Sequence, residues 1–223
     1  MHQTMIQRYE NGCMMLMKRS SGSVLYIGTA FIVHSEGYLL TAAHMLSPDD
    51  ELVVVPAAQA GNFTPFSMEV VTPYPVKVAQ IDQSRNVALL KMELSEPIAA
   101  PDQIIGNPDS SFEGTYVLTF GVPFGHLRIH NIMVLQGMIS ARLLSPNETK
   151  LFLFDAVTHP GTIGGPLVNS EDGRIIGIIQ GRFEPIKVTQ QETPEDLGIA
   201  SHLSYAVSIE YGRELAEKEG IEI

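Results

Sequence analysis

Short apolar runs separated by turn residues make up most of the chain, and each run is seven to eleven residues long. Runs of this length that are rich in β-branched and aromatic residues are typical of β-strands. Eight of them are predicted strands, at residues 23–33, 37–43, 51–57, 86–92, 115–122, 132–139, 150–157 and 173–181. Their spacing favours an antiparallel barrel or sandwich.

Only the tail of the chain, at residues 208–220, has the pattern of a helix. Ser208 can cap its first turn, Glu210 lies in that turn, and Gly220 follows its end. The sequence therefore predicts an all-β protein with a single helix at its C-terminal end.

A polar, proline-containing stretch at residues 94–111 interrupts the strands near the middle of the chain, and we interpret it as a linker. The segments on either side share a faint repeat, in which AFIVHSEGYLLTAAH (30–44) resembles GPLVNSEDGRIIGII (165–179). We predict an N-terminal β-domain at 1–100 and a C-terminal β-domain at 101–223. Two similar units joined by a linker leave a cleft between them, where binding sites usually lie.

Composition and charge exclude several function classes. The chain has 223 residues, of which 44% are hydrophobic and 17% charged, as in a globular protein. The net charge of −11 argues against binding to nucleic acid, which needs a basic face. The start of the chain lacks the order of a secretory signal, and no apolar run approaches the length of a membrane span. Because Cys13 is the only cysteine, no disulfide is implied, and we expect a cytoplasmic protein that binds no membrane.

Two segments carry candidate chemistry. His44 follows an apolar strand and two alanines, whose small side chains let the chain turn tightly and hold an imidazole at the strand end. The segment 160–165 places glycines on both sides of position 163, and such a turn can direct consecutive backbone N–H groups into one space. Each has a structural explanation alone, as a partly buried histidine and as a hairpin connection. Together, with one in each half, they indicate a site.

Three segments together resemble the trypsin-like serine protease domain of the HtrA (Deg) type. They are GTAFIVHSEGYLLTAAH (28–44), QIDQSRNVALLKM (80–92) and FDAVTHPGTIGGPLVN (154–169). The resemblance covers about residues 20–218, with the motifs in family order. It implies a trypsin-like (chymotrypsin) fold of two six-stranded antiparallel β-barrels with a C-terminal helix.

The resemblance also implies roles for individual positions. His44 matches the catalytic histidine, position 86 the aspartate that orients it, and position 163 the nucleophile. The backbone N–H groups of Gly161 and Ile163 match the oxyanion hole. The apolar floor of the side-chain pocket is expected near Val157. The strand that pairs with substrate backbone comprises Ile178, Ile179, Gln180, Gly181 and Arg182.

Two of these positions hold residues that the chemistry cannot use. Ile163 has no nucleophilic atom, so covalent acyl transfer cannot begin there. Asn86 is nearly isosteric with aspartate but neutral, and its NH₂ group can donate to the histidine and fix the wrong tautomer. In the template serine protease, that change alone lowers kcat by about 10⁴-fold. We therefore predict a catalytically inactive pseudoprotease that binds peptides or proteins or acts as a regulatory module.

Two other functions stay open. The chain could be an active serine endopeptidase with an unconventional nucleophile, such as Thr162, or an inactivated variant of one. It could also be a structural subunit that associates with active relatives. Cys13 is interpreted as an incidental thiol, and His126 and His130 as loop residues, because a metal site needs more ligands.

The expected partner is a peptide or protein ligand, and no cofactor or metal is expected. The resemblance also implies a homo-oligomer, with a trimer formed through N-terminal segments such as residues 5–13.

Overall fold

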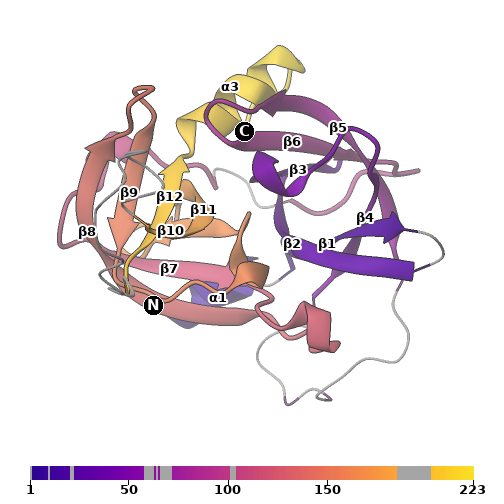
Figure 1. Ribbon diagram of the computed structural model, residues 1–223, viewed down its shortest axis with the longest axis horizontal. Helices are drawn as coiled ribbons and strands as arrows, with labels where there is room; N and C mark the ends of the chain where they lie inside the picture. The colour runs from indigo at the N-terminus through magenta and orange to yellow at the C-terminus, as the bar shows by residue number, and fades with distance from the viewer. Residues whose placement is uncertain are drawn as a thin grey trace, which may run out of the picture.

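The computed structural model describes residues 2–9, 11–20, 23–57, 63, 65, 72–100, 104–184 and 202–223. In this part of the chain, two closed barrels of six antiparallel strands each lie side by side (Figure 1). The predicted pair of six-stranded antiparallel barrels is therefore confirmed. None of the described helices is long and apolar enough to cross a membrane.

The first barrel contains β1 (Cys13–Ser20), β2 (Ser23–His34), β3 (Tyr38–Ala42), β4 (Glu51–Pro56), β5 (Tyr74–Asp82) and β6 (Val87–Met92). It closes through the pairing of β1 with β4. The second contains β7 (Tyr116–Gly121), β8 (Met133–Leu144), β9 (Lys150–Phe154), β10 (Pro166–Asn169), β11 (Ile175–Arg182) and β12 (Ser204–Ser208). It closes through the pairing of β10 with β7. In the described residues, four short 3₁₀ helices lie between strands: η1 (Ala43–Met45), η2 (Pro108–Ser110), η3 (Gly125–Leu127) and η4 (Pro160–Thr162).

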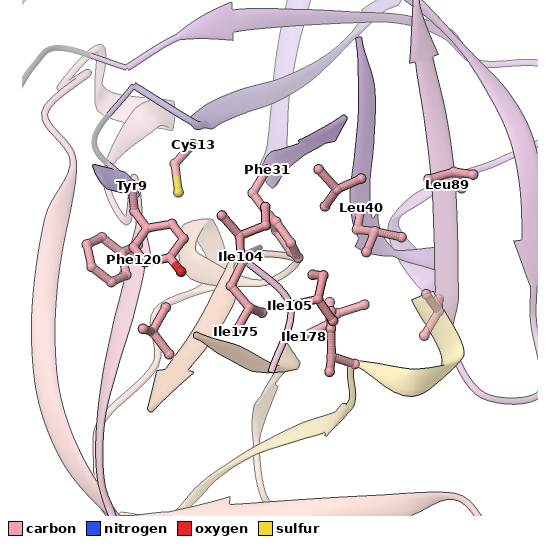
Figure 2. Close-up of a cluster of buried hydrophobic side chains, with 14 of the residues drawn as sticks. Tyr9, Cys13, Phe31, Leu40, Leu89, Ile104, Ile105, Phe120, Ile175 and Ile178 are labelled. Carbon is pink, nitrogen blue, oxygen red and sulfur yellow. The ribbon is translucent and has the colours of Figure 1, made fainter. Parts of the chain in front are cut away.

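The strands at the barrel contact are buried on both faces, which explains their continuous apolar runs. Along β2, Ala30 and Ile32 point into the first barrel. The alternate residues, Phe31 and Val33, join a cluster shared with the second barrel. Successive strand side chains point to opposite faces, so both sets are apolar only where both faces are covered. Figure 2 shows this shared cluster, with members from both barrels.

A second helix, α1 (His2–Tyr9), precedes β1, so the expectation of a single helix was wrong. Tyr9 is buried and packs against Phe120 of β7, with ring centroids 5.4 Å apart. Its hydroxyl donates to the carbonyl of Gly173 in the second barrel. The stabilisation of α1 comes from this docking, which the local sequence does not reveal.

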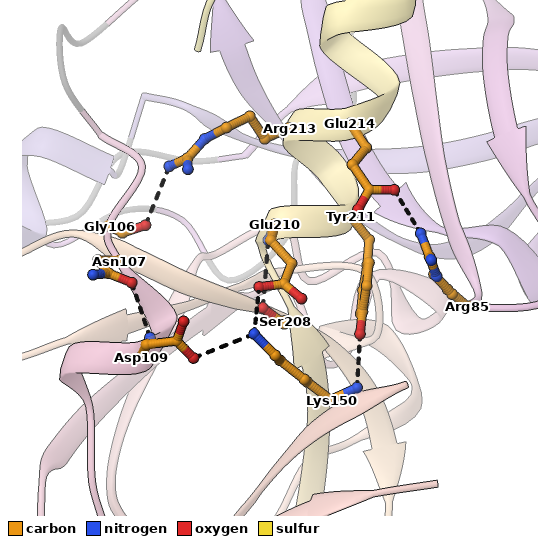
Figure 3. A network of polar contacts seen from close by, with 10 residues as sticks. All are labelled: Arg85, Gly106, Asn107, Asp109, Lys150, Ser208, Glu210, Tyr211, Arg213 and Glu214. Atoms are coloured by element: carbon orange, nitrogen blue, oxygen red, sulfur yellow. Dashed lines mark hydrogen bonds and ion pairs between the residues drawn. The ribbon is translucent and has the colours of Figure 1, made fainter. Parts of the chain in front are cut away.

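The C-terminal helix α3 (Glu210–Lys218) packs on the first barrel although it follows the last strand of the second. Arg85 donates to Glu214 at 2.5 Å, and a Cβ at Gly212 would lie 2.5 Å from Leu40 Cδ1, so helix and barrel are in close contact (Figure 3). Each terminal helix thus packs on the barrel formed by the other half of the sequence. Helix α1 packs on the second barrel, and α3 packs on the first.

The helix begins two residues later than predicted. Ser208 ends β12, and Ile209 occupies the N-cap position without a side-chain cap. The Ser208 hydroxyl lies 3.4 Å from the Glu210 N–H, at the outer limit of a hydrogen bond (Figure 3).

Candidate functional site

His44 lies in η1, directly after β3, with its side chain exposed at the barrel contact. Asn86, which precedes β6, faces it. Asn86 has φ 61°, in the left-handed region that asparagine tolerates better than most residues. Its carbonyl accepts from the Ala43 N–H at 3.2 Å. The structure thus brings together two of the positions expected from the sequence.

The Asn86 side chain has one orientation that satisfies its neighbours. The backbone N–H of His44 can only donate, and it donates to Asn86 Oδ1 at 2.7 Å. The Asn86 NH₂ group therefore faces His44 Nδ1, 2.7 Å away. Because this NH₂ can only donate, Nδ1 must accept, and the neutral ring carries its proton on Nε2. A general base for a serine hydroxyl needs the opposite tautomer, with Nε2 free to accept.

Hydrogen bonds of the Gln180 side chain hold the Asn86 amide in this orientation. It is buried, and its Oε1 accepts from Asn86 Nδ2 at 2.6 Å. Its Nε2 lies 3.2 Å from two backbone carbonyl oxygens, those of Asn86 and Ile178. Reversing the Asn86 amide would place its Oδ1 against Gln180 Oε1, and reversing the Gln180 amide would place its Oε1 against the two backbone carbonyl oxygens. The sequence placed Gln180 only on the substrate strand, and no sequence signal revealed its contact with Asn86.

Two backbone N–H groups of the turn that carries Ile163 donate to carbonyls of the same turn, and we call this turn closed. In η4, the N–H of Thr162 donates to the His159 carbonyl at 2.9 Å, and the N–H of Ile163 donates to the Pro160 carbonyl at 3.3 Å. An oxyanion hole needs donors that point at the ligand. The Ile163 N–H of the expected oxyanion hole is instead engaged within the turn.

Side chains of β2 hold this turn from the first barrel. The carbonyl of Gly161 accepts from Thr29 Oγ1 at 2.7 Å, and the Tyr26 hydroxyl lies 2.5 Å from the Val122 carbonyl and 2.7 Å from the Gly161 carbonyl. The Thr29 N–H donates to the Ile163 carbonyl at 2.9 Å. Gly164 has φ +83°, and a Cβ there would collide with the Thr29 carbonyl, so only glycine fits. Burial raises the pKa of the Tyr26 phenol, which stays a donor. Neither Tyr26 nor Thr29 was singled out from the sequence.

Thr162, the nearest alternative hydroxyl, is 2% exposed and faces away from the solvent. Its Oγ1 donates to the His159 carbonyl at 2.8 Å. In this conformation the hydroxyl cannot reach a substrate carbonyl.

A cavity of about 430 Å³ opens beside Ile163 and His44. Thr158 and Tyr205 line it together with β11 residues Gly181 and Arg182. Val157, the expected floor, is 39% exposed and is not among the residues that line the cavity. Its neighbour Thr158 lines the cavity instead, and the Thr158 Oγ1 lies 3.0 Å from the Ser204 hydroxyl. The lining therefore contains a polar residue where an apolar one was expected.

Among the described residues, β11 has a strand partner on only one side where it borders the cavity. Gly181 and Arg182 pair with β12. On the opposite side, the pairing with β10 ends at Ile178, and Ile179 exchanges its backbone hydrogen bonds with Gly164 and Gly165. Ile163 reaches over this edge, since its Cδ1 would lie 3.5 Å from a Cβ at Gly181. The strand expected to bind substrate thus lies at the cavity.

The remaining candidates lie elsewhere. Cys13 is buried in the contact between the barrels, and burial raises the pKa of its thiol. His126 is exposed in η3, whereas burial lowers the pKa of His130. Among the described residues, no group of three or more histidine, cysteine, aspartate or glutamate side chains is arranged to hold a metal.

Comparisons with known proteins agree with this geometry. A family model described as a trypsin-like peptidase domain matches residues 28–178. A probable periplasmic serine endoprotease, DegP-like, from Pseudomonas fulva is 33% identical over 155 residues, 68% of this chain. The magnetosome formation protease MamE of Paramagnetospirillum magneticum is 29% identical over 168 residues, 73% of this chain. The matches cover 28% and 21% of those two proteins, so the chain corresponds to a minor part of their length.

A solved HtrA-type protease, AlgW with a tripeptide, superposes with a TM-score of 0.70 at 22% identity. The match covers 98% of this chain and 63% of the other, and it shows the shared fold.

The relatives also correct one expectation. Those from Pseudomonas fulva and Pseudomonas putida are named periplasmic, which contradicts the expected cytoplasmic location. The lone cysteine and the first residues were the basis for that expectation.

Proposed function

The chain belongs to the family of trypsin-like peptidase domains, and we propose that it is a non-catalytic member that binds extended peptide segments without cutting them. The observation that carries the proposal is the state of the three triad positions. Ile163 supplies no nucleophile, and Asn86 donates to His44 at 2.7 Å. Neither the attacking group nor the base that would activate it is present.

The closed turn supports the same conclusion. Even with a nucleophile, a tetrahedral intermediate would lack the Ile163 N–H, which is donated to Pro160. Loss of a single oxyanion donor costs about 10²–10³-fold in kcat. The buried Thr162 hydroxyl argues against the alternative of an active endopeptidase with an unconventional nucleophile.

Peptide binding is supported by the edge of β11 and the adjoining cavity. An extended peptide can add to a strand edge through main-chain hydrogen bonds, while a side chain enters the adjoining pocket. Gly181 and Arg182 of this edge both line the cavity. For one short strand and one anchor, we expect a Kd of roughly micromolar or weaker. By analogy with the named relatives, the protein acts outside the cytoplasm.

The trimer implied by family resemblance stays a prediction. Tyr9 is buried against the second barrel, and Met5 and Ile6 pack against the same core. An assembly through this segment would have to use its outer surface, and light scattering coupled to gel filtration would measure the oligomeric state.

A protease assay tests the absence of catalysis. Purified protein is incubated with fluorescent casein and with a fluorophosphonate probe, beside the His44→Ala variant as a matched control. We expect no hydrolysis and no covalent labelling by either protein. Activity of the wild type that disappears in His44→Ala would overturn the proposal, whereas activity common to both would identify a contaminant.

A binding assay tests the groove. A library of fluorescent peptides is titrated by fluorescence polarisation, and hydrogen exchange then locates the best ligand. We expect protection of backbone amides near residues 181–184, at the cavity edge of β11. The binding role is wrong if no peptide binds more tightly than about millimolar, or if protection falls elsewhere.

A further inference from the structure

The cavity at β11 is lined almost entirely by the second barrel. Among the described residues that line it, only His44 belongs to the first barrel. Next to His44 in sequence, the Met45 side chain packs over Gly28, and its Cε would lie 2.8 Å from a Cβ at Gly164. Met45 thus packs against the turn that carries Ile163.

Two of the residues that line the cavity, His44 and Arg182, carry hydrogen-bond donors. The amide of Asn86 fixes the His44 proton on Nε2, which makes the exposed ring a donor toward the cavity. Arg182 is exposed and has no ion pair with any described residue. Glu184 also lines the cavity and has an interaction partner of its own.

An active protease needs His44 Nε2 as an acceptor, so a fixed donor there changes what the site can bind. A donor pairs best with an anionic oxygen, because charge-assisted hydrogen bonds are roughly twice as strong as neutral ones. The Ile163 N–H donates to the Pro160 carbonyl within η4 and adds no second donor, so the selectivity rests on His44 and Arg182.

We propose that the cavity receives the C-terminal end of an extended peptide, with the terminal carboxylate hydrogen-bonded to His44 Nε2. An acidic side chain a few residues upstream pairs with the Arg182 guanidinium. The ligand class is therefore a free, acidic C-terminus rather than an internal loop or an unfolded segment. This inference rests on the proposed binding function of the same cavity.

Three matched peptides test the proposal by fluorescence polarisation. They share one sequence with an N-terminal fluorophore and end in a free carboxylate, in an amide, or in four further glycine and serine residues. We expect the free acid to bind at least tenfold more tightly than the other two. In His44→Ala, the three affinities should become equal, and circular dichroism should show unchanged folding because the ring is exposed.

A second comparison tests Arg182. Glutamate is exchanged for glutamine at each of the last four peptide positions in turn. One position should lose about tenfold in affinity with the wild type and nothing with Arg182→Gln. Lys218→Gln is the matched control, since it removes the same charge from an exposed site outside the cavity, and it should behave as wild type.

The outcomes separate the inference from the proposed function. Equal binding of acid, amide and extended peptides would overturn the inference and leave peptide binding intact. A preference for the free acid that persists in His44→Ala would also overturn it. Failure of all three peptides and of the wider library to bind would overturn the proposed function itself.

Discussion

Rebuilding the triad would show how far the site has changed beyond its two substituted positions. The perturbation is a series of three variants: Ile163→Ser, then Ile163→Ser with Asn86→Asp, then both with Gln180→Ser. In the first variant, the serine hydroxyl meets His44 with a proton already on Nε2. By analogy with the template enzyme, this tautomer costs about 10⁴-fold in kcat, or about 5 kcal/mol in activation free energy. We expect no measurable turnover.

The second variant restores the orienting carboxylate but sets it against Gln180. A carboxylate oxygen would take the place of Asn86 Nδ2, which now lies 2.6 Å from Gln180 Oε1. Two acceptors cannot share that distance, so the Gln180 amide must reverse. Its Nε2 would then leave the carbonyls of residues 86 and 178, each 3.2 Å away. Unpairing such buried groups costs about 1–3 kcal/mol, which corresponds to roughly 10–100-fold in activity.

The third variant removes this conflict, because a serine hydroxyl can rotate and donate to the carboxylate directly or through water. We expect about tenfold more activity than in the double variant. The assays are fluorescent casein hydrolysis and the rate of fluorophosphonate labelling, with folding checked by circular dichroism. Gln180→Ser added to Ile163→Ser alone is the control, and it should gain nothing.

Each step has a result that would refute it. If Ile163→Ser alone were as active as the double variant, the argument from the His44 tautomer would be wrong. If the double and triple variants were equally active, Gln180 would not restrain the carboxylate. If all were folded and inert, the closed η4 turn would be the dominant block, since the Ile163 N–H is held by Pro160.

Three further predictions follow from the contacts around the site and α3. Tyr26→Phe removes the hydroxyl that lies 2.5 Å from the Val122 carbonyl and 2.7 Å from the Gly161 carbonyl, and urea denaturation should show a loss of about 1–3 kcal/mol in unfolding free energy. The hydrogen bond that Lys150 donates to Glu210 raises the pKa of this lysine, so it stabilises the fold below its ordinary pKa and ceases to do so as pH rises through the raised value. The stability difference between wild type and Lys150→Met, less than about 1 kcal/mol for this exposed pair, should be constant at neutral pH and decline only as the pH rises beyond the ordinary lysine pKa of ~10.4. Nitrogen-15 chemical shifts of His44 in the neutral ring should report a protonated Nε2, and a protonated Nδ1 would contradict the assigned amide orientation.

Local pattern alone missed several elements whose stability comes from distant contacts. β1 is rich in methionine, which has no strong strand preference, yet Met15 is fully buried between the barrels. β5 is mostly exposed, and Val76 is its only fully buried residue, so it lacked an apolar run. α1 depends on Tyr9 docking against β7, more than a hundred residues away in sequence. The contacts that stabilise these elements join residues far apart in the chain, so a short window of sequence does not reveal them.

Thr158 lines the cavity, whereas its neighbour Val157 does not. Side chains alternate along an extended chain, so Ala156 and Thr158 are buried and Val157 points outward. The family resemblance indicated this segment, but the direction of each side chain follows from the pairing and bending of neighbouring strands.

The sequence by itself determined the class of fold, the positions that would form a triad, and the absence of a nucleophile and a carboxylate among them. The all-β class follows from the spacing of apolar runs, and the triad positions follow from the family resemblance of three segments; both rest on local sequence. Only the tertiary structure decided that Gln180 meets Asn86, that the pair fixes the proton of His44, and that Tyr26 and Thr29 hold a closed turn. The physical reason is that hydrogen bonds are directional. Whether an amide or a backbone N–H faces a ligand or a neighbouring carbonyl depends on groups that folding brings together from both barrels.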